Sequence, residues 1–87
     1  MTIHMILTRE PSVLKRIESV MQDGDVLLLA SDGCYQARRL PATWDVQALT
    51  ADMKARGLDE PFENIALLND DEWVALITTN GQVASWT

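Results

Sequence analysis

The stretch "VLLLASDGCYQARR" occupies residues 26–39, and its first five residues decide the fold class. Residues 26–30 are continuously apolar and do not alternate with polar residues. A strand that is buried on both faces has this pattern, and such strands belong to parallel sheets covered by helices. Turn-forming residues follow at 31–33, and residues 34–40 have the pattern of a short helix. The stretch therefore predicts a buried parallel strand that leads through a tight turn into a helix.

Strand and helix patterns alternate in both directions from this segment. Alternation of this kind is typical of an α/β fold with a mostly parallel sheet, here of about five strands. Right-handed crossover connections would place helices on both faces of that sheet. The predicted strands are residues 2–8, 26–30, 44–50, 64–69 and 82–87, and the predicted helices are residues 11–22, 34–40, 51–58 and 70–80.

Local signals support the predicted helices. The first helix has an apolar stripe at helical spacing, and Trp73 shares a face of the last helix with Leu76 and Ile77. Gly57 is expected to adopt the left-handed conformation that ends a helix, and Asn69 or Asp70 is expected to cap the last helix. The stripe of the first helix consists of Val13, Leu14, Ile17, Val20 and Met21.

The predicted helices are too few and too short to cover a sheet of this size. An uncovered apolar face is costly in water and is commonly buried by another chain. We therefore expect exposed apolar surface on the isolated chain and an oligomer that covers it.

Size and charge exclude several functions. The chain has 87 residues, which predicts one domain spanning residues 1–87. Its formal net charge is -6, so direct binding to the phosphates of a nucleic acid is not expected. No basic amphipathic stretch, signal peptide or long apolar run is present, so we expect no membrane association and a cytoplasmic location. One cysteine and one histidine are too few for a four-ligand zinc site, and no metal or other cofactor is predicted.

Cys34 is the one candidate for catalysis. It lies where a predicted parallel strand ends and a helix begins, a position at which reactive groups gather in open α/β sheets. The amides of the helix start and Arg38, one turn further on, would favour the thiolate, whereas Asp32 would disfavour it. The alternative is a small buried residue that only packs, which is the usual role of a free cysteine. The sequence favours this alternative.

Asp32 and Gly33 are interpreted as a structural turn. Asp32 is expected to cap the following helix, and Gly33 is a candidate for positive φ. His4 is expected to be a hydrogen-bonded strand residue, and the less favoured alternative is a base beside a partner subunit's cysteine. No catalytic triad can be built from this one histidine.

Two arginines and two tryptophans are candidates for contact with other subunits. Arg38 and Arg39 form a basic pair in an acidic chain, which favours a surface or interface role over RNA binding. Trp86 lies one residue from the end of the sequence, so it either completes the core at an edge strand or anchors an interface. Trp44 precedes the third predicted strand and is a further interface candidate.

Four segments, taken in order, resemble the TusB/DsrH family of sulfur-relay subunits. "IHMILTREP" resembles the family's opening strand and turn, and "DGDVLLLASDGCYQA" resembles its glycine turn, aliphatic strand and Asp-Gly segment. "VQALTADMKARGL" resembles the third strand with the Ala-Arg-Gly helix, and "WVALITTNGQVASWT" resembles the last helix and the closing tryptophan. Each segment is weak alone, but together they span nearly the whole chain.

This resemblance implies a small three-layer α/β/α fold of the DsrE/DsrF/DsrH group. It also implies one subunit of a heterohexamer with TusC/DsrF-like and TusD/DsrE-like partners. A TusBCD-like complex supports 2-thiolation of the wobble uridine in tRNA, whereas a DsrEFH-type complex serves sulfur oxidation. The relay cysteine of such complexes lies on the D/E-type subunit, and the family usually has an aliphatic residue at the position of Cys34. The Dsr-branch cysteine would fall near Ile17, where this chain has no thiol.

Three functions follow from these observations. The favoured one is a non-catalytic subunit of a relay complex of the Tus type, without catalytic activity of its own. The second is a thiol or persulfide carrier that uses Cys34. The third is a homo-oligomer with a structural or regulatory role, because a fold alone does not fix a function.

Overall fold

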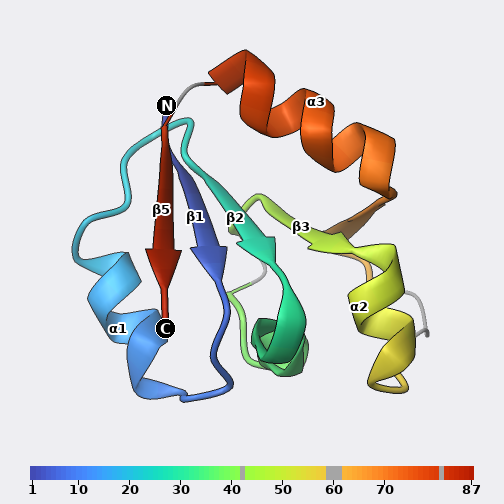
Figure 1. The fold of residues 1–87 in the computed structure, drawn as a ribbon. Coiled ribbons are helices and arrows are strands. Elements are labelled where there is room, and N and C mark those ends of the chain that lie inside the picture. Colours follow the sequence, from blue (N-terminus) through green and yellow to red (C-terminus); the bar gives the residue numbers. More distant parts are fainter. Residues whose placement is uncertain (42, 59–61, 81) are drawn as a thin grey trace.

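A computed structural model describes residues 1–41, 43–58, 62–80 and 82–87. Within these residues the strands form one sheet in the order β4-β3-β2-β1-β5, and every neighbouring pair is parallel (Figure 1). The predicted α/β class and parallel sheet are confirmed. Each predicted strand is present but shorter than its predicted range. The strands are β1 (Ile3–Ile6), β2 (Val26–Leu29), β3 (Val46–Leu49), β4 (Ile65–Leu68) and β5 (Val83–Trp86).

The apolar run that begins at Val26 forms the middle strand of the sheet, β2. All four residues of β2 are buried, and Leu27, Leu28 and Leu29 are each 0% exposed. Successive side chains of a strand point to opposite faces, so this burial requires cover on both sides of the sheet. The interpretation of residues 26–30 as a strand buried on both faces is therefore confirmed.

The helices divide unequally between the two faces. The connections from β1 to β2, from β2 to β3 and from β3 to β4 each lead to the neighbouring strand in the same direction across the sheet. The connection from β4 to β5 runs in the opposite direction and ends at the other edge of the sheet. Right-handed crossovers then place the first three helical segments on one face and the last on the other. The main core cluster contains residues of the first three segments, and Figure 1 shows α3 apart from them. The helical segments are α1 (Ser12–Glu18), the 3₁₀ helix η1 (Ser31–Arg38), α2 (Thr50–Ala55) and α3 (Asp70–Asn80).

The apolar stripe of the first helix packs largely as predicted. Val13 and Ile17 are fully buried, and Leu14 and Met21 pack partly buried against the core. Val20, which was predicted to belong to this buried stripe, is instead 49% exposed. The reason is that α1 ends at Glu18, so the helical period no longer sets the direction of residue 20.

The turn after β2 differs from its prediction in two ways. Its left-handed residue is Ser31, with φ of 52°, and Gly33 does not have positive φ. The expectation that Asp32 caps a helix is also wrong, because η1 already begins at Ser31 and Asp32 forms an ion pair elsewhere. Gly33 is needed for a different reason: a Cβ there would lie 1.8 Å from the carbonyl oxygen of Ile6. Glycine therefore lets η1 approach the backbone of β1.

Two predicted helix signals are confirmed. Gly57 follows α2 with φ of 70°, the left-handed conformation expected of a glycine at this position. Asn69 caps α3. Its side-chain Oδ1 accepts a hydrogen bond from the backbone amide of Glu72 at 2.8 Å, and its backbone amide donates to the Glu72 carboxylate at 3.0 Å. This reciprocal pair is a capping box, which fixes the start of α3.

Apolar side chains remain exposed at both edges of the sheet and on α3, as the limited helix cover predicted. Leu67 on edge strand β4 is 46% exposed, Val83 on edge strand β5 is 42% exposed, and Val74 on α3 is 53% exposed. The two edge strands each pair on one side only in the described part of the chain. Across the same residues, none of the helices combines the length and hydrophobicity that a membrane span requires.

Candidate functional site

Cys34 lies in η1, directly after the carboxyl end of β2. Its side chain is 0% exposed and belongs to the core cluster formed by the sheet, α1, η1 and α2. The structure thus places this cysteine at the strand end that the sequence indicated. It also places it beneath the surface, where a substrate cannot reach the sulfur unless the surrounding chain moves.

A small group of charged side chains joins η1 to α2 near Cys34. The Asp52 carboxylate accepts a hydrogen bond from the Ser31 amide at 2.7 Å. The Arg56 Nε donates to the Asp32 carboxylate at 3.2 Å, and another Arg56 nitrogen donates to the carbonyl oxygen of Asp52 at 3.1 Å. The Arg56 guanidinium also reaches the Ser31 hydroxyl at 3.4 Å. These contacts hold the left-handed turn at Ser31 in place.

This environment keeps Cys34 protonated. Burial raises the pKa of the Cys34 thiol from an ordinary 9.0 to about 11, and the Asp52 carboxylate adds to the increase. The Arg56 guanidinium acts in the opposite direction but is outweighed, and Asp32 raises the pKa further. The sequence missed Asp52 and Arg56, whose influence comes from the packing of α2 against η1. Only the thiolate is a strong nucleophile, so the site favours an unreactive thiol at neutral pH.

We expect Cys34 to react slowly with alkylating reagents in the folded protein. A pKa of about 11 leaves roughly 100-fold less thiolate at neutral pH than an ordinary cysteine has, and burial restricts access as well. Iodoacetamide should therefore modify the native chain at least about 100-fold more slowly than the urea-unfolded chain, followed by mass spectrometry. A native rate equal to the unfolded rate would contradict this environment.

The four predicted interface residues each contact other parts of the chain. The Arg38 guanidinium lies 5.8 Å from the centre of the Phe62 ring, and Arg39 Nη1 donates to the carbonyl oxygen of Arg9 at 2.9 Å. Trp44 is partly buried against the core and lines a surface pocket of about 270 Å³ at the amino end of β3. Trp86 is partly buried on the face that carries α1. These contacts join the four residues to different segments of the chain.

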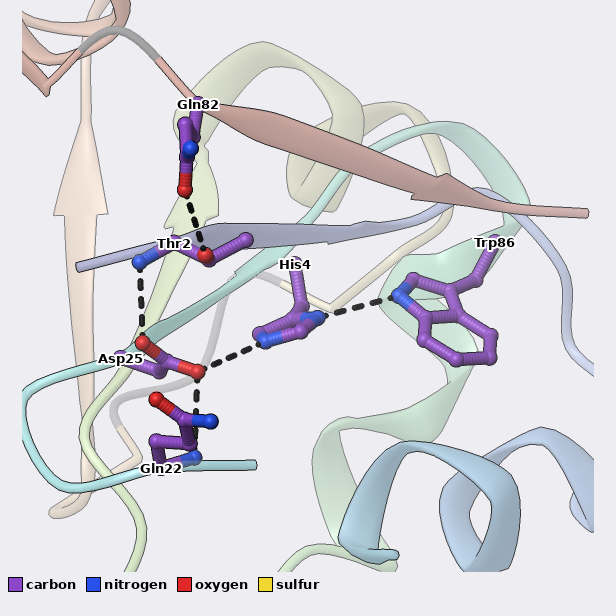
Figure 2. A network of polar contacts seen from close by, with 6 residues as sticks. All are labelled: Thr2, His4, Gln22, Asp25, Gln82 and Trp86. Carbon is purple, nitrogen blue, oxygen red and sulfur yellow. Dashed lines mark hydrogen bonds and ion pairs between the residues drawn. The ribbon is translucent and has the colours of Figure 1, made fainter. Parts of the chain in front are cut away.

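A buried polar network at the amino ends of β1 and β2 was not predicted (Figure 2). His4 Nε2 lies 3.0 Å from Asp25 Oδ2, and the Trp86 indole nitrogen donates to His4 Nδ1 at 3.2 Å. Asp25 also accepts from the backbone amides of Thr2 at 2.9 Å and Gln22 at 3.1 Å. The prediction that His4 is a hydrogen-bonded strand residue is confirmed. Its partners are 21 and 82 residues away, so no local pattern in the sequence could identify them.

The network makes the stability of the protein dependent on Asp25. The hydrogen bonds from His4 and from the Thr2 amide lower the pKa of Asp25 from an ordinary 3.8 to about 2. A carboxyl group with a lowered pKa in the folded state stabilises it fully above the unfolded pKa, and this contribution disappears as the pH falls through the folded pKa.

We therefore predict that Asp25→Asn reduces stability most above about pH 4. Its difference from the wild type should shrink as the pH falls towards about 2, because the wild-type carboxylate is then protonated too. Urea unfolding at several pH values measures this difference. Exposed Asp23→Asn in the same turn is the control, and an Asp25→Asn deficit that stays constant over this range would contradict the assignment.

The fold and the site together define a small parallel α/β protein with a buried, protonated cysteine at the end of its middle strand. A family model described as DsrH like protein matches residues 9–83, so the chain belongs to the DsrH-like family. A comparison with curated proteins found no match. Family membership supports a sulfur-relay subunit in general terms and suggests membership in a DsrEFH-type complex.

Proposed function

We propose that this chain is a non-catalytic subunit of a TusBCD-like sulfur-relay complex that supports 2-thiolation of the wobble uridine in tRNA. The observation that carries the proposal is the environment of Cys34 in a member of the DsrH-like family. A buried thiol with a raised pKa is poorly suited to accept or pass on a persulfide. In this proposal the sulfur stays on a partner, and this chain supports the partner's geometry.

The first helix favours the Tus branch over the Dsr branch. The Dsr-type subunit is expected to carry its own cysteine near residue 17, and in this chain Ile17 occupies that place. The Ile17 side chain is 0% exposed and packs in the main core cluster. The position therefore supplies hydrophobic packing here, and a sulfur-oxidation subunit is the less favoured alternative.

The surface supports assembly with other subunits. Exposed apolar side chains on the two edge strands and on α3 would be buried by TusC/DsrF-like and TusD/DsrE-like partners in a heterohexamer. A net charge of -6 makes direct binding of tRNA by this chain unfavourable, so RNA contact is assigned to the partners. In this proposal residues 1–87 act as one domain in the cytoplasm, where a free thiol persists.

The test is co-expression with neighbouring DsrE-like and DsrF-like chains, followed by native mass spectrometry. The purified complex is then incubated with a persulfide donor, and the added sulfur is located by mass on each subunit. A mixed hexamer with sulfur on the partner alone, and with full relay activity in Cys34→Ala, is the expected result.

Three results would overturn the proposal. Sulfur on Cys34 that disappears together with relay activity in Cys34→Ala would make this chain a carrier. Failure to bind either partner while the chain forms a stable homo-oligomer would favour a structural role outside the relay. Transfer of sulfur to a sulfur-oxidation acceptor and not to tRNA would instead assign the complex to the Dsr branch.

A further inference from the structure

The buried contacts of His4 define which of its ring nitrogens carries the proton. An indole N–H can only donate a hydrogen bond, so the Trp86 nitrogen at 3.2 Å requires an unprotonated His4 Nδ1 as its acceptor. The ring proton of neutral His4 is then on Nε2, which donates to Asp25 Oδ2 at 3.0 Å. Figure 2 shows the imidazole between these two partners. The observed arrangement therefore requires neutral histidine.

Trp86 fastens the last strand to the rest of the fold. β5 lies at the edge of the sheet and pairs with β1, and the Trp86 carbonyl oxygen accepts from the Leu7 amide at 2.9 Å. Its indole ring packs partly buried against the main core cluster. Val83 and Ser85, in contrast, are exposed. Apart from its backbone pairing with β1, β5 is therefore attached to the rest of the fold largely by the side-chain contacts of Trp86.

Protonation of His4 would reverse the polarity of the Trp86 contact. A proton on Nδ1 turns the acceptor into a donor that points at another donor, so the hydrogen bond is lost and the two N–H groups repel. Two charged groups lie against this pair in the described part of the chain. The Asp25 carboxylate faces Nε2 and would retain a charged histidine, and the Arg16 guanidinium of α1 lies 5.6 Å from the centre of the Trp86 ring. A protonated His4 therefore keeps its contact with the Asp25 carboxylate and loses its hydrogen bond with the Trp86 indole.

We propose that the juxtaposition of Asp25, His4 and Trp86 is a proton-sensitive latch that holds the C-terminal strand β5 against β1 and loosens it when His4 is protonated. Asp25 remains ionised throughout the range in which histidines ordinarily titrate, because its own pKa is about 2. The Asp25 carboxylate therefore accepts from His4 Nε2 whether or not Nδ1 carries a proton. The latch does not depend on the proposed relay function.

The test follows the indole N–H signals of the wild-type protein by ¹H–¹⁵N NMR from about pH 8 to about pH 5, a range on both sides of ordinary histidine titration. Trp86→Phe assigns the Trp86 signal, and the histidine ¹⁵N shifts report the protonation of each ring nitrogen. Hydrogen exchange of the Trp86 indole, corrected for its intrinsic pH dependence, should accelerate on the order of ten-fold as His4 is protonated. The indole groups of Trp44 and Trp73 should show no such change and serve as internal controls.

His4→Gln is the matched variant, because its side chain is polar but does not titrate in this range. In this variant the Trp86 signal should lose its pH dependence. If the variant does not fold, the wild-type comparison between Trp86 and Trp44 still decides the question. A Trp86 indole that stays equally protected while His4 acquires its proton would overturn the proposal, as would a His4 that stays neutral until the whole chain unfolds.

Discussion

Replacing Gly33 by alanine should destabilise the protein by about 4 kcal/mol or more, because the new methyl group would collide with a central strand. Its Cβ would lie 1.8 Å from the carbonyl oxygen and 2.5 Å from the carbonyl carbon of Ile6. Both are backbone atoms, and the same oxygen accepts the Ala30 amide at 3.1 Å. Neither partner can rotate away as a flexible side chain would, so η1 must lift from the sheet.

A loss of this size is a large share of the total stability. A chain of 87 residues is expected to have a free energy of unfolding of about 4–13 kcal/mol. The midpoint of thermal unfolding should fall by roughly 20 °C or more, measured by circular dichroism. Urea unfolding gives the change in free energy directly.

Gly57→Ala is the control for backbone conformation. Gly57 has φ of 70°, and a Cβ there meets no atom within 4 Å. Its replacement should cost about 1–2 kcal/mol from conformational strain alone. Gly33 lacks positive φ, so its larger cost must come from the contact with Ile6. Equal effects of the two substitutions would contradict this explanation.

The fold could be predicted because its signals are local. The run at residues 26–30 indicates burial on both faces, and the alternation of short strands and helices indicates a parallel sheet. Gly57 and Asn69 mark helix ends through their own chemistry, and both predictions are confirmed. Most of the observed strands and helices begin or end at other residues than predicted, because the ends of short elements depend on tertiary contacts as well as on the sequence period.

The details around the candidate site could not be predicted because they depend on long-range packing. Gly33 was interpreted as part of a strand-to-helix turn, but it lies within the 3₁₀ helix η1, and a side chain there would collide with Ile6, 27 residues earlier in the sequence. Asp32 was assigned to a helix cap, yet its partner is Arg56 on the next connection. The raised pKa of Cys34 depends on burial and on Asp52, and neither is visible in the residues beside it.

Gln36 is the clearest case of a residue that the sequence did not single out. It is a polar side chain in a 3₁₀ helix, but it is 0% exposed. Its amide nitrogen donates to the carbonyl oxygens of Thr8 at 3.2 Å and Glu10 at 2.8 Å. Its oxygen accepts from Arg39 at 3.3 Å. Gln36 thereby ties η1 to the connection between β1 and α1, which lacks regular structure of its own.

We predict that Gln36→Ala destabilises the protein by about 2–4 kcal/mol. The substitution removes the donors of two carbonyl groups and leaves a cavity where a fully buried side chain was packed. Buried polar groups without a partner cost about 1–3 kcal/mol, and water entering the connection would recover part of that loss. The loss should be localised: backbone amides of residues 7–11 should exchange hydrogen faster, while those of β2 should follow the global stability alone.

Gln22→Ala is the matched control, because the exposed side chain of Gln22 is replaced while its backbone amide still donates to Asp25. It should change the free energy of unfolding by less than about 0.5 kcal/mol. Gln36→Leu separates the two causes, since leucine fills most of the cavity but still leaves the carbonyl groups of Thr8 and Glu10 without their donor. If Gln36→Leu restores wild-type stability, the cavity and not the hydrogen bonding explains the loss. If it remains as unstable as Gln36→Ala, the amide donors are what hold the connection at the carboxyl end of β1 in place.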